Sequence, residues 1–184
     1  MDRPTDDDAA LMLAWVAGDA ASFPLLYSRQ KDRLYRFILR SVRQREMAEE
    51  IFQETWSRAI AARERYQPGA RFSTWLLQIA HNLIIDAFRR QRPESTGETY
   101  EAAVASHPGD EGNQPEHTLS DFQQRRRLQQ AIDGLPGEQR VAFLLRMENE
   151  LSVEEIGEVT GVGRETAKSR LRYAMNRIRE LMTP

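Results

Sequence analysis

The chain has 184 residues, 40% of them hydrophobic, with 26 basic and 28 acidic side chains and a net charge of −2. This length allows one domain or two small ones, and the low apolar fraction suits small helical domains with much exposed surface. No apolar run is long enough to cross a bilayer, and the acidic N-terminus is unlike a secretory signal. Cysteine is absent, which excludes disulfides, thiol catalysis and thiolate zinc sites and fits a cytoplasmic protein.

The near-neutral total conceals segments of opposite charge. Residues 11–92 carry fourteen basic and eight acidic side chains, a net charge of +6. Residues 121–184 carry eleven basic and ten acidic side chains, whereas residues 93–120 carry six acidic side chains and no Lys or Arg. The average charge therefore leaves room for a polyanionic partner, because basic domains flank an acidic connector.

Four helices are expected before residue 93, because apolar residues recur there at helical spacing. The expected spans are 7–17, 21–42, 47–66 and 73–91, with breaks at Gly18-Asp19 and at Gln67-Pro68-Gly69. The residues expected to face the core from the first and third spans are Leu11, Leu13 or Ala14, Trp15, Ile51, Thr55 or Trp56, and Ile60. No alternating strand pattern is present, so the fold class is predicted to be all-α.

Residues 93–118 are predicted to form a flexible acidic linker, because proline, glycine and acidic residues occur there without helical periodicity. The linker would separate a domain at residues 1–92 from one at residues 119–184. In the second domain, helices are expected at 119–133 and 137–149, followed by the last thirty residues.

The last thirty residues have the pattern of a helix-turn-helix. Ser152 and Glu155 fit a capping box that starts a helix at Val153, and Gly161 and Gly163 suit a tight turn. The second helix is expected to bury Ala167, Leu171, Ala174 or Met175, and Ile178. The second helix of this motif enters the major groove of DNA.

The alternative is an amphipathic helical pair with a solvated basic face. Two observations favour DNA binding instead. From Gly163 to Arg179 there are six basic residues and one acidic residue, a net charge of +5. Short polar side chains, Thr166 and Ser169, lie beside the first basic residues, at the end of the helix that contacts bases and phosphates.

Residues 66–92 combine aromatic and basic side chains as single-stranded DNA requires. Tyr66, Phe72 and Trp75 are candidates for stacking on bases, although Trp75 also lies close to the apolar stripe of its helix. Phosphate contacts are expected from Arg71, Arg89, Arg90 and Arg92. Asn82 is a candidate for reading a base edge, because an amide offers a donor and an acceptor together. Asp86 is expected to pair with Arg89 or Arg90.

Residues 48–60 carry an acidic and amide-rich helix face, formed by Glu49, Glu50, Gln53 and Glu54. The face suits a basic partner helix, and a plain solvated surface is the alternative.

In order and spacing, these segments resemble the sigma-70 family of RNA polymerase sigma factors, in its extracytoplasmic-function (ECF) group. The resemblance covers nearly the whole chain. It is carried by Gly18-Asp19, Leu34-Tyr35-Arg36-Phe37, Ala48 to Thr55, Phe72 to Asn82, Asp86 to Arg90, Gly134-Leu135-Pro136 and Leu151 to Arg172. The turn departs from the family pattern, which most commonly has Pro-Val-Gly-Thr before the basic residues, whereas this chain has Val162-Gly163-Arg164-Glu165-Thr166. The extra Arg–Glu pair leaves the base preference open, but not the mode of docking.

The resemblance implies a sigma-2-like four-helix domain and a sigma-4-like helix-turn-helix domain on either side of the linker. Glu49, Glu50, Gln53 and Glu54 would bind the clamp helices of core RNA polymerase, and some of Leu135, Val141, Phe143 and Leu144 would contact its flap. Asn82 and the loop at residues 67–72 would hold a base flipped from the minus-10 strand. Minus-35 duplex contacts would come from Arg164, Thr166, Lys168, Ser169, Arg170 and Arg172. An anti-sigma factor is a further expected partner, and the linker would be either a spacer or a polyanionic peptide that enters the polymerase channels.

An enzymatic function has little support, because the three histidines form no metal spacing, the serines have no nucleophile setting, and His81 is expected on the surface. No cofactor or metal is expected. Two other functions remain as alternatives: a sigma-like interaction protein, and a helix-turn-helix regulator without initiation activity. The basic second helix disfavours the former, and the Trp75–Arg90 segment disfavours the latter.

Overall fold

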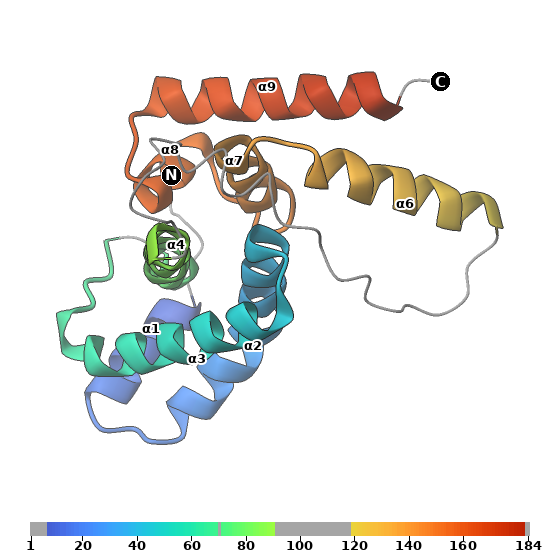
Figure 1. Cartoon of the computed structure of the whole chain (residues 1–184). Coiled ribbons are helices and arrows are strands. Elements are labelled where there is room, and N and C mark those ends of the chain that lie inside the picture. The colour runs from blue at the N-terminus through green and yellow to red at the C-terminus, as the bar shows by residue number, and fades with distance from the viewer. Residues whose placement is uncertain (1–6, 70, 91–118, 183–184) are drawn as a thin grey trace.

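The computed structural model describes residues 7–69, 71–90 and 119–182, and every regular element among them is a helix. Figure 1 shows an N-terminal group of helices below a C-terminal group. The N-terminal group comprises α1 (Asp7–Val16), α2 (Ser22–Val42), α3 (Arg45–Ala61), the 3-10 helix η1 (Arg63–Arg65) and α4 (Phe72–Arg90). The C-terminal group comprises α6 (Leu119–Asp133), α7 (Gly137–Met147), α8 (Val153–Thr160) and α9 (Arg164–Met182). The all-α prediction is confirmed, while the expected linker lies outside the described residues.

The core of the N-terminal group lies around α2, which packs against α1, α3 and α4. Leu26, Leu34 and Phe37 are at most 2% exposed, and their spacing places them on one face of α2. The buried apolar residues of α4 form the opposing face: Phe72, Leu76, Leu77, Ala80, Leu83, Ile84, Ala87 and Phe88. The expected four-helix group is therefore present.

The expected core positions of α1 and α3 need two corrections. Of the alternatives Leu13 and Ala14, Leu13 is 43% exposed and Ala14 is half-buried, and the fully buried residue of α1 is Met12. Ile60 is 38% exposed, although Ile51 and Trp56 on the same helix are buried as expected. The third helix ends at Ala61 rather than near residue 66, so Ile60 lies in its last turn. Periodicity gives the spacing of a face, but the neighbouring helices decide which turns of that face are covered.

The C-terminal group is built around α7 and α9, which pack against each other, with α6 against α9 and α8 against both α7 and α9. Leu144 and Leu145 of α7 are fully buried. From α9, the expected Ala167, Ala174 and Ile178 are buried, and Leu171 is half-buried. The predicted apolar face of the second helix is therefore confirmed, with Ala174 rather than Met175 inside.

The helix-turn-helix forms as its local sequence predicts. The Ser152 hydroxyl accepts a hydrogen bond from the Glu155 N–H at 3.2 Å, and the Ser152 N–H donates to Glu155 Oε2 at 2.8 Å. This reciprocal pair is the predicted capping box. Gly161 ends α8 with φ +69°, a left-handed conformation that glycine adopts readily. At Gly157, an added Cβ would lie only 2.8 Å from the Val162 carbonyl oxygen, so the turn closes onto α8 because that position has no side chain.

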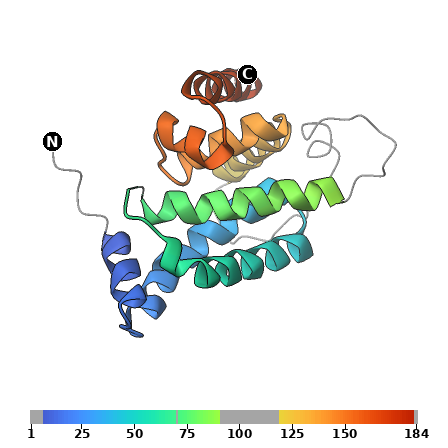
Figure 2. The ribbon, with the colours of Figure 1, turned by 90° about the vertical axis from the view of Figure 1, so that its left-hand side faces the viewer.

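The two groups touch along α4, which lies between them in Figure 2 and packs against α8. The Thr74 hydroxyl donates to Glu155 Oε1 at 3.4 Å. One turn further along α4, Gln78 Nε2 donates to the Glu158 carbonyl oxygen at 3.2 Å. The first helix of the helix-turn-helix therefore rests on α4.

A second contact joins α2 to α7. Arg40 forms an ion pair with Glu148, and burial lowers the pKa of Arg40 below its usual value. Arg140, which is 0% exposed, donates to the Ser41 carbonyl oxygen at 3.4 Å and to the Asp133 carbonyl oxygen at 3.1 Å. Charged side chains from both groups are thus partly removed from water where the groups meet.

Candidate nucleic-acid interface

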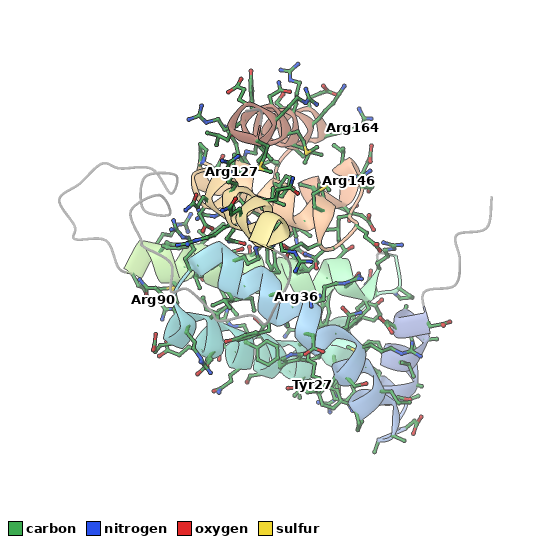
Figure 3. All side chains as sticks on the ribbon, turned by 90° about the vertical axis from the view of Figure 1, so that its right-hand side faces the viewer. Tyr27, Arg36, Arg90, Arg127, Arg146 and Arg164 are labelled. Atoms are coloured by element: carbon green, nitrogen blue, oxygen red, sulfur yellow. The ribbon has the colours of Figure 1, made fainter. Side chains whose placement is uncertain are left out.

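One face of α9 presents polar and basic side chains to solvent. The side chains of α9, Arg164 among them, project from the top of the molecule in Figure 3. Arg164, Lys168 and Arg172 are exposed and follow one another at four-residue intervals, so they form one basic stripe along the helix. Thr166 is exposed on another side of the helix, and Ser169 is half-buried beside this stripe. These five predicted minus-35 residues lie where a DNA backbone can reach them.

The Arg164-Glu165 pair, which departs from the family pattern, connects α8 to α9. Arg164 Nε lies 2.5 Å from Glu154 Oε1, and this hydrogen bond lowers the pKa of the Glu154 carboxyl and raises that of Arg164. Glu165 lies 3.1 Å from Arg164 Nη1 and 3.8 Å from Lys168 Nζ. All four side chains are exposed, so phosphates can compete for the two cations.

Arg170 does not lie on the exposed basic stripe. It pairs with Glu138 of α7, and its side chain is only 21% exposed. Position 170 lies three residues after the buried Ala167 and four before the buried Ala174, so its side chain leaves α9 on the side that faces the protein. The expectation that Arg170 is available to DNA is therefore corrected for this conformation.

Tyr173 is an exposed aromatic residue that the sequence analysis missed. It is 54% exposed, and the Arg172 guanidinium lies 5.1 Å from its ring centre. The signal was present in the sequence, because position 173 lies outside the buried set of α9. Tyr173 extends the polar face of α9 with a ring that is stacked against a cation.

On α4, one exposed stripe carries most of the predicted minus-10 residues. Half-buried Trp75, exposed Asn82 and exposed Arg89 follow at helical spacing along this face, and Arg90 lies beside its end. The expected pairing of Asp86 is confirmed, because its carboxylate lies 4.0 Å from Arg89 Nη1. Asn82 is thus an exposed amide beside an arginine-rich helix end, an arrangement that suits an unpaired base and its phosphate.

Tyr66 and Phe72 are core residues in this conformation, which corrects the expectation that their rings are available for stacking. They are 6% and 1% exposed. Their ring centres lie 5.9 Å apart, and the ring of Trp75 lies 5.3 Å from that of Tyr66. The burial of the other two rings leaves Trp75 as the partly exposed edge of this cluster.

The acidic face of α3 is exposed as expected. Glu49, Glu50, Gln53 and Glu54 all lie in solvent. Arg45 Nε lies 2.9 Å from Glu49, and Arg58 Nε lies 2.7 Å from Glu54. The hydrogen bond to Glu49 raises the pKa of Arg45. A basic partner helix would replace these exposed pairs, each of which is worth little in water.

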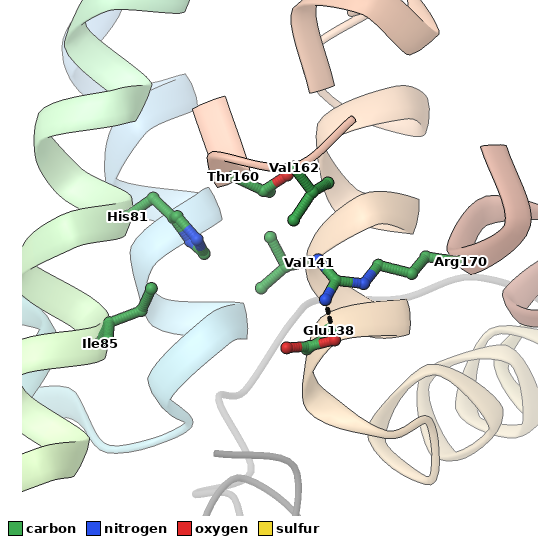
Figure 4. Close-up of a pocket in the computed structure, with 7 residues that line it drawn as sticks. All are labelled: His81, Ile85, Glu138, Val141, Thr160, Val162 and Arg170. Atoms are coloured by element: carbon green, nitrogen blue, oxygen red, sulfur yellow. Dashed lines mark ion pairs between the residues drawn. The ribbon is translucent and has the colours of Figure 1, made fainter. Parts of the chain in front are cut away.

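A cavity lies where α4 meets the C-terminal group (Figure 4). It is lined by His81, Ile85, Glu138, Val141, Thr160, Val162 and Arg170. His81 was expected on the surface but is only 4% exposed. Burial, assisted by the positive charge of Arg170, lowers the pKa of His81 to about 4. The error arises because the C-terminal group covers a face of α4 that is the surface of its own helical group.

Among the described residues, no three His, Asp or Glu side chains gather as a metal site would require. No helix in the same part of the chain has the length and apolarity needed to cross a bilayer.

Comparison with known proteins gives matches to both helical groups. Residues 26–94 match sigma-70 region 2, and residues 125–178 match sigma-70 region 4. The chain is 34% identical over 186 residues to the ECF RNA polymerase sigma factor SigE of Mycolicibacterium smegmatis, covering 98% of this chain and 70% of that protein. It is 34% identical over 167 residues to the RNA polymerase sigma factor CarQ of Myxococcus xanthus, covering 90% of this chain and 91% of that one.

A solved structure agrees with these relatives. The sigma factor RpoE from Bartonella quintana, crystallised with the anti-sigma factor NepR, superposes with a TM-score of 0.66 and 27% identity. The superposition covers 87% of this chain and 96% of that one. Two sigma-70 regions in the family's order, together with relatives that match nearly the whole chain, show that this chain belongs to the extracytoplasmic-function group of the RNA polymerase sigma-70 family.

Proposed function

We propose that this chain binds core RNA polymerase and directs transcription initiation at specific promoters. The observation that carries the proposal is that one chain holds both sigma-70 regions, each with an exposed surface of different chemistry. The basic stripe of α9 suits the phosphates and grooves of duplex DNA. The stripe of α4 that contains Asn82 suits an unpaired strand.

The division of labour follows these surfaces. Residues 119–184 would read the minus-35 element through α9, and residues 1–92 would read the melted minus-10 strand through Trp75, Asn82, Arg89, Arg90 and Arg71. Tyr66 and Phe72 would take part only after the protein rearranges, since they are enclosed in the present conformation, whereas Arg170 would stay paired with Glu138. The acidic face of α3 would bind the polymerase clamp helices.

The same proposal supplies the remaining partners. The C-terminal domain would also contact the polymerase flap, and the acidic linker at residues 93–118 would connect the domains. An anti-sigma factor is a proposed regulator, which is supported by the complex of the related RpoE with NepR. The protein would act in the cytoplasm as an initiation factor and not as an enzyme.

Run-off transcription tests this function against the two alternatives. Core polymerase without any sigma factor is mixed with the full chain and fragmented genomic DNA from its own source, and the RNA 5′ ends are sequenced. A sigma factor gives discrete start sites that share upstream sequence, and the Asn82→Ala variant gives fewer transcripts from the same starts. Core polymerase that stays inactive with a folded wild-type chain would leave only an interaction protein or a helix-turn-helix regulator.

A further inference from the structure

The contact between α4 and α8 is incompatible with the simultaneous use of both DNA-binding surfaces. The minus-10 and minus-35 elements are separated by about 25 base pairs, or about 85 Å along a duplex. The 19 residues of α9 span about 28 Å, and α8, which precedes α9, lies within hydrogen-bonding distance of α4. The observed arrangement is therefore a closed state, and the domains must separate before both elements are bound.

We propose that the Glu155 carboxylate occupies the position beside Arg71 and Thr74 that a promoter phosphate would take, and that its contacts with these two residues stabilise the closed state. The proposal rests on the proposed function and adds a regulation of the same DNA-binding surfaces.

The two oxygens of Glu155 divide between two tasks. Oε2 accepts the Ser152 N–H at 2.8 Å and completes the capping box of α8. Oε1 accepts the Thr74 hydroxyl at 3.4 Å and lies 3.7 Å from Arg71 Nε. An arginine and a hydroxyl are also common ligands of a DNA phosphate. A phosphate bound there would displace the carboxylate, because both anions need the same donors.

The geometry of the whole contact favours reversible closure. Polar interactions join the two helical groups at several points. They include the Gln78 hydrogen bond between α4 and α8 and the Arg40–Glu148 ion pair between α2 and the end of α7. Buried atoms in this region, Arg40 Nε, His81 Nδ1 and Glu148 Oε2, have no hydrogen-bond partner in the described part of the protein. Incompletely paired polar groups weaken an interface, so modest changes in charge can shift the balance between closed and open states.

The decisive variant is Glu155→Gln. Glutamine can still close a capping box, so the substitution removes the charge that Arg71 contacts while it preserves α8. The matched control is Glu158→Gln, which removes the same charge from an exposed side chain of the same helix. The Gln78 hydrogen bond to Glu158 is accepted by the backbone carbonyl oxygen, which the substitution keeps. The chain has no cysteine, so Ser57→Cys on α3 and Asn176→Cys on α9 give two exposed labelling sites in the full chain.

Pulsed EPR between these labels measures the open fraction directly. Glu155→Gln is expected to raise the ratio of open to closed molecules about two- to fivefold, the range for a partly exposed ion pair. Added salt should open the wild type more than this variant, because the screened pair is already absent. Combining Glu148→Gln with Glu155→Gln should open the chain further. Equal distance distributions for wild type, Glu155→Gln and Glu158→Gln would overturn the proposal.

Binding of a fluorescent single-stranded A·T-rich oligonucleotide to the full chain gives a second readout. Glu155→Gln should bind it about two- to fivefold more tightly than Glu158→Gln, because Arg71 and Thr74 no longer have a competing anion. Equal binding by the two variants would mean that Glu155 does not occupy a DNA site. If Glu155 does not stabilise the closed state, wild-type run-off transcription should still be observed. If the chain is not a sigma factor, run-off transcription should be absent, so the two outcomes are distinguishable.

Discussion

The two helices that we propose to contact DNA, α9 and α4, differ in how much of the proposed binding surface is already exposed. On α9 the basic stripe is already exposed to solvent. Duplex DNA presents its grooves and phosphates without prior melting, so this stripe could bind it as it stands. Beside α4, the aromatic rings of Tyr66 and Phe72 remain in the core. Exposing them without an unpaired base to cover them would leave apolar area in water at about 25 cal/mol per Å². The surface proposed for duplex DNA is thus already exposed, whereas the surface proposed for melted DNA would be completed only when its ligand binds.

Phe72→Ala should have the largest effect and tests whether this ring belongs to the core. Its ring is 1% exposed, so its removal should lower the free energy of unfolding by about 3–5 kcal/mol. Denaturant unfolding of the full chain measures the loss. Trp75→Ala is the matched control and should lose clearly less, since Trp75 is half-buried. Equal losses would contradict the division between an enclosed ring and a partly exposed one.

Acidification should weaken the contact that covers the inner face of α4. The pKa of His81 is lowered from 6.5 to about 4, so the closed state requires the neutral ring. The contribution of the neutral His81 ring to the free energy of unfolding is complete above pH 6.5 and declines as the pH falls toward 4. By pH 5 the loss is about 2 kcal/mol. Glu138 and Arg170 are the other charged groups at this cavity.

Denaturant midpoints at pH 7.5 and pH 5 measure this effect. Between these two pH values the wild type should lose more stability than the His81→Gln variant, because glutamine at position 81 does not titrate. Identical losses in the two proteins would show that His81 is not the group responsible.

Asn82→Ala tests whether the exposed stripe of α4 reads the melted strand. Loss of a paired amide contact to a base should weaken minus-10 strand binding about tenfold. Since Asn82 is exposed, the free energy of unfolding should change by less than about 0.5 kcal/mol. Oligonucleotide titration of polymerase holoenzyme gives the affinity, with Ser57→Ala on α3 as a control. An equal loss of core polymerase binding would count against this role.

Lys168→Ala and Arg170→Ala form the smallest and most selective pair. Removal of one phosphate contact should lower the slope of log affinity against log salt by about one for Lys168→Ala. Arg170→Ala should leave the slope unchanged, because Arg170 pairs with Glu138. Affinity for a minus-35 duplex is measured at several salt concentrations. The reverse result would place Arg170, and not Lys168, on the DNA.

Local sequence rules predicted the features whose causes are local. The capping box at Ser152 and the turn at Gly161 need only neighbouring residues, and both formed as expected. The burial of His81 could not be predicted, because it depends on cavity-lining residues that lie more than fifty positions later in the chain, from Glu138 onward. Arg170 was assigned to DNA because it is basic, although its spacing from Ala167 already placed it on the inner side of α9. The sequence pattern does not distinguish an aromatic residue of the core from one that stacks on bases. Only the packing of the folded protein shows that Tyr66 is buried and Trp75 is partly exposed.

Gly157 bears on the proposed promoter recognition, although it is a buried residue of α8 and not part of the exposed face of α9. Any side chain there would meet the Val162 carbonyl oxygen at 2.8 Å and push the turn outward. α9 begins at Arg164, two residues after Val162, so a small displacement of the turn would change the orientation of the whole helix relative to the DNA groove that we propose it enters. If α9 reads promoter DNA as we propose, its orientation therefore depends on the absence of a side chain at position 157, and a substitution there would change which bases α9 contacts while its contacting side chains stayed the same.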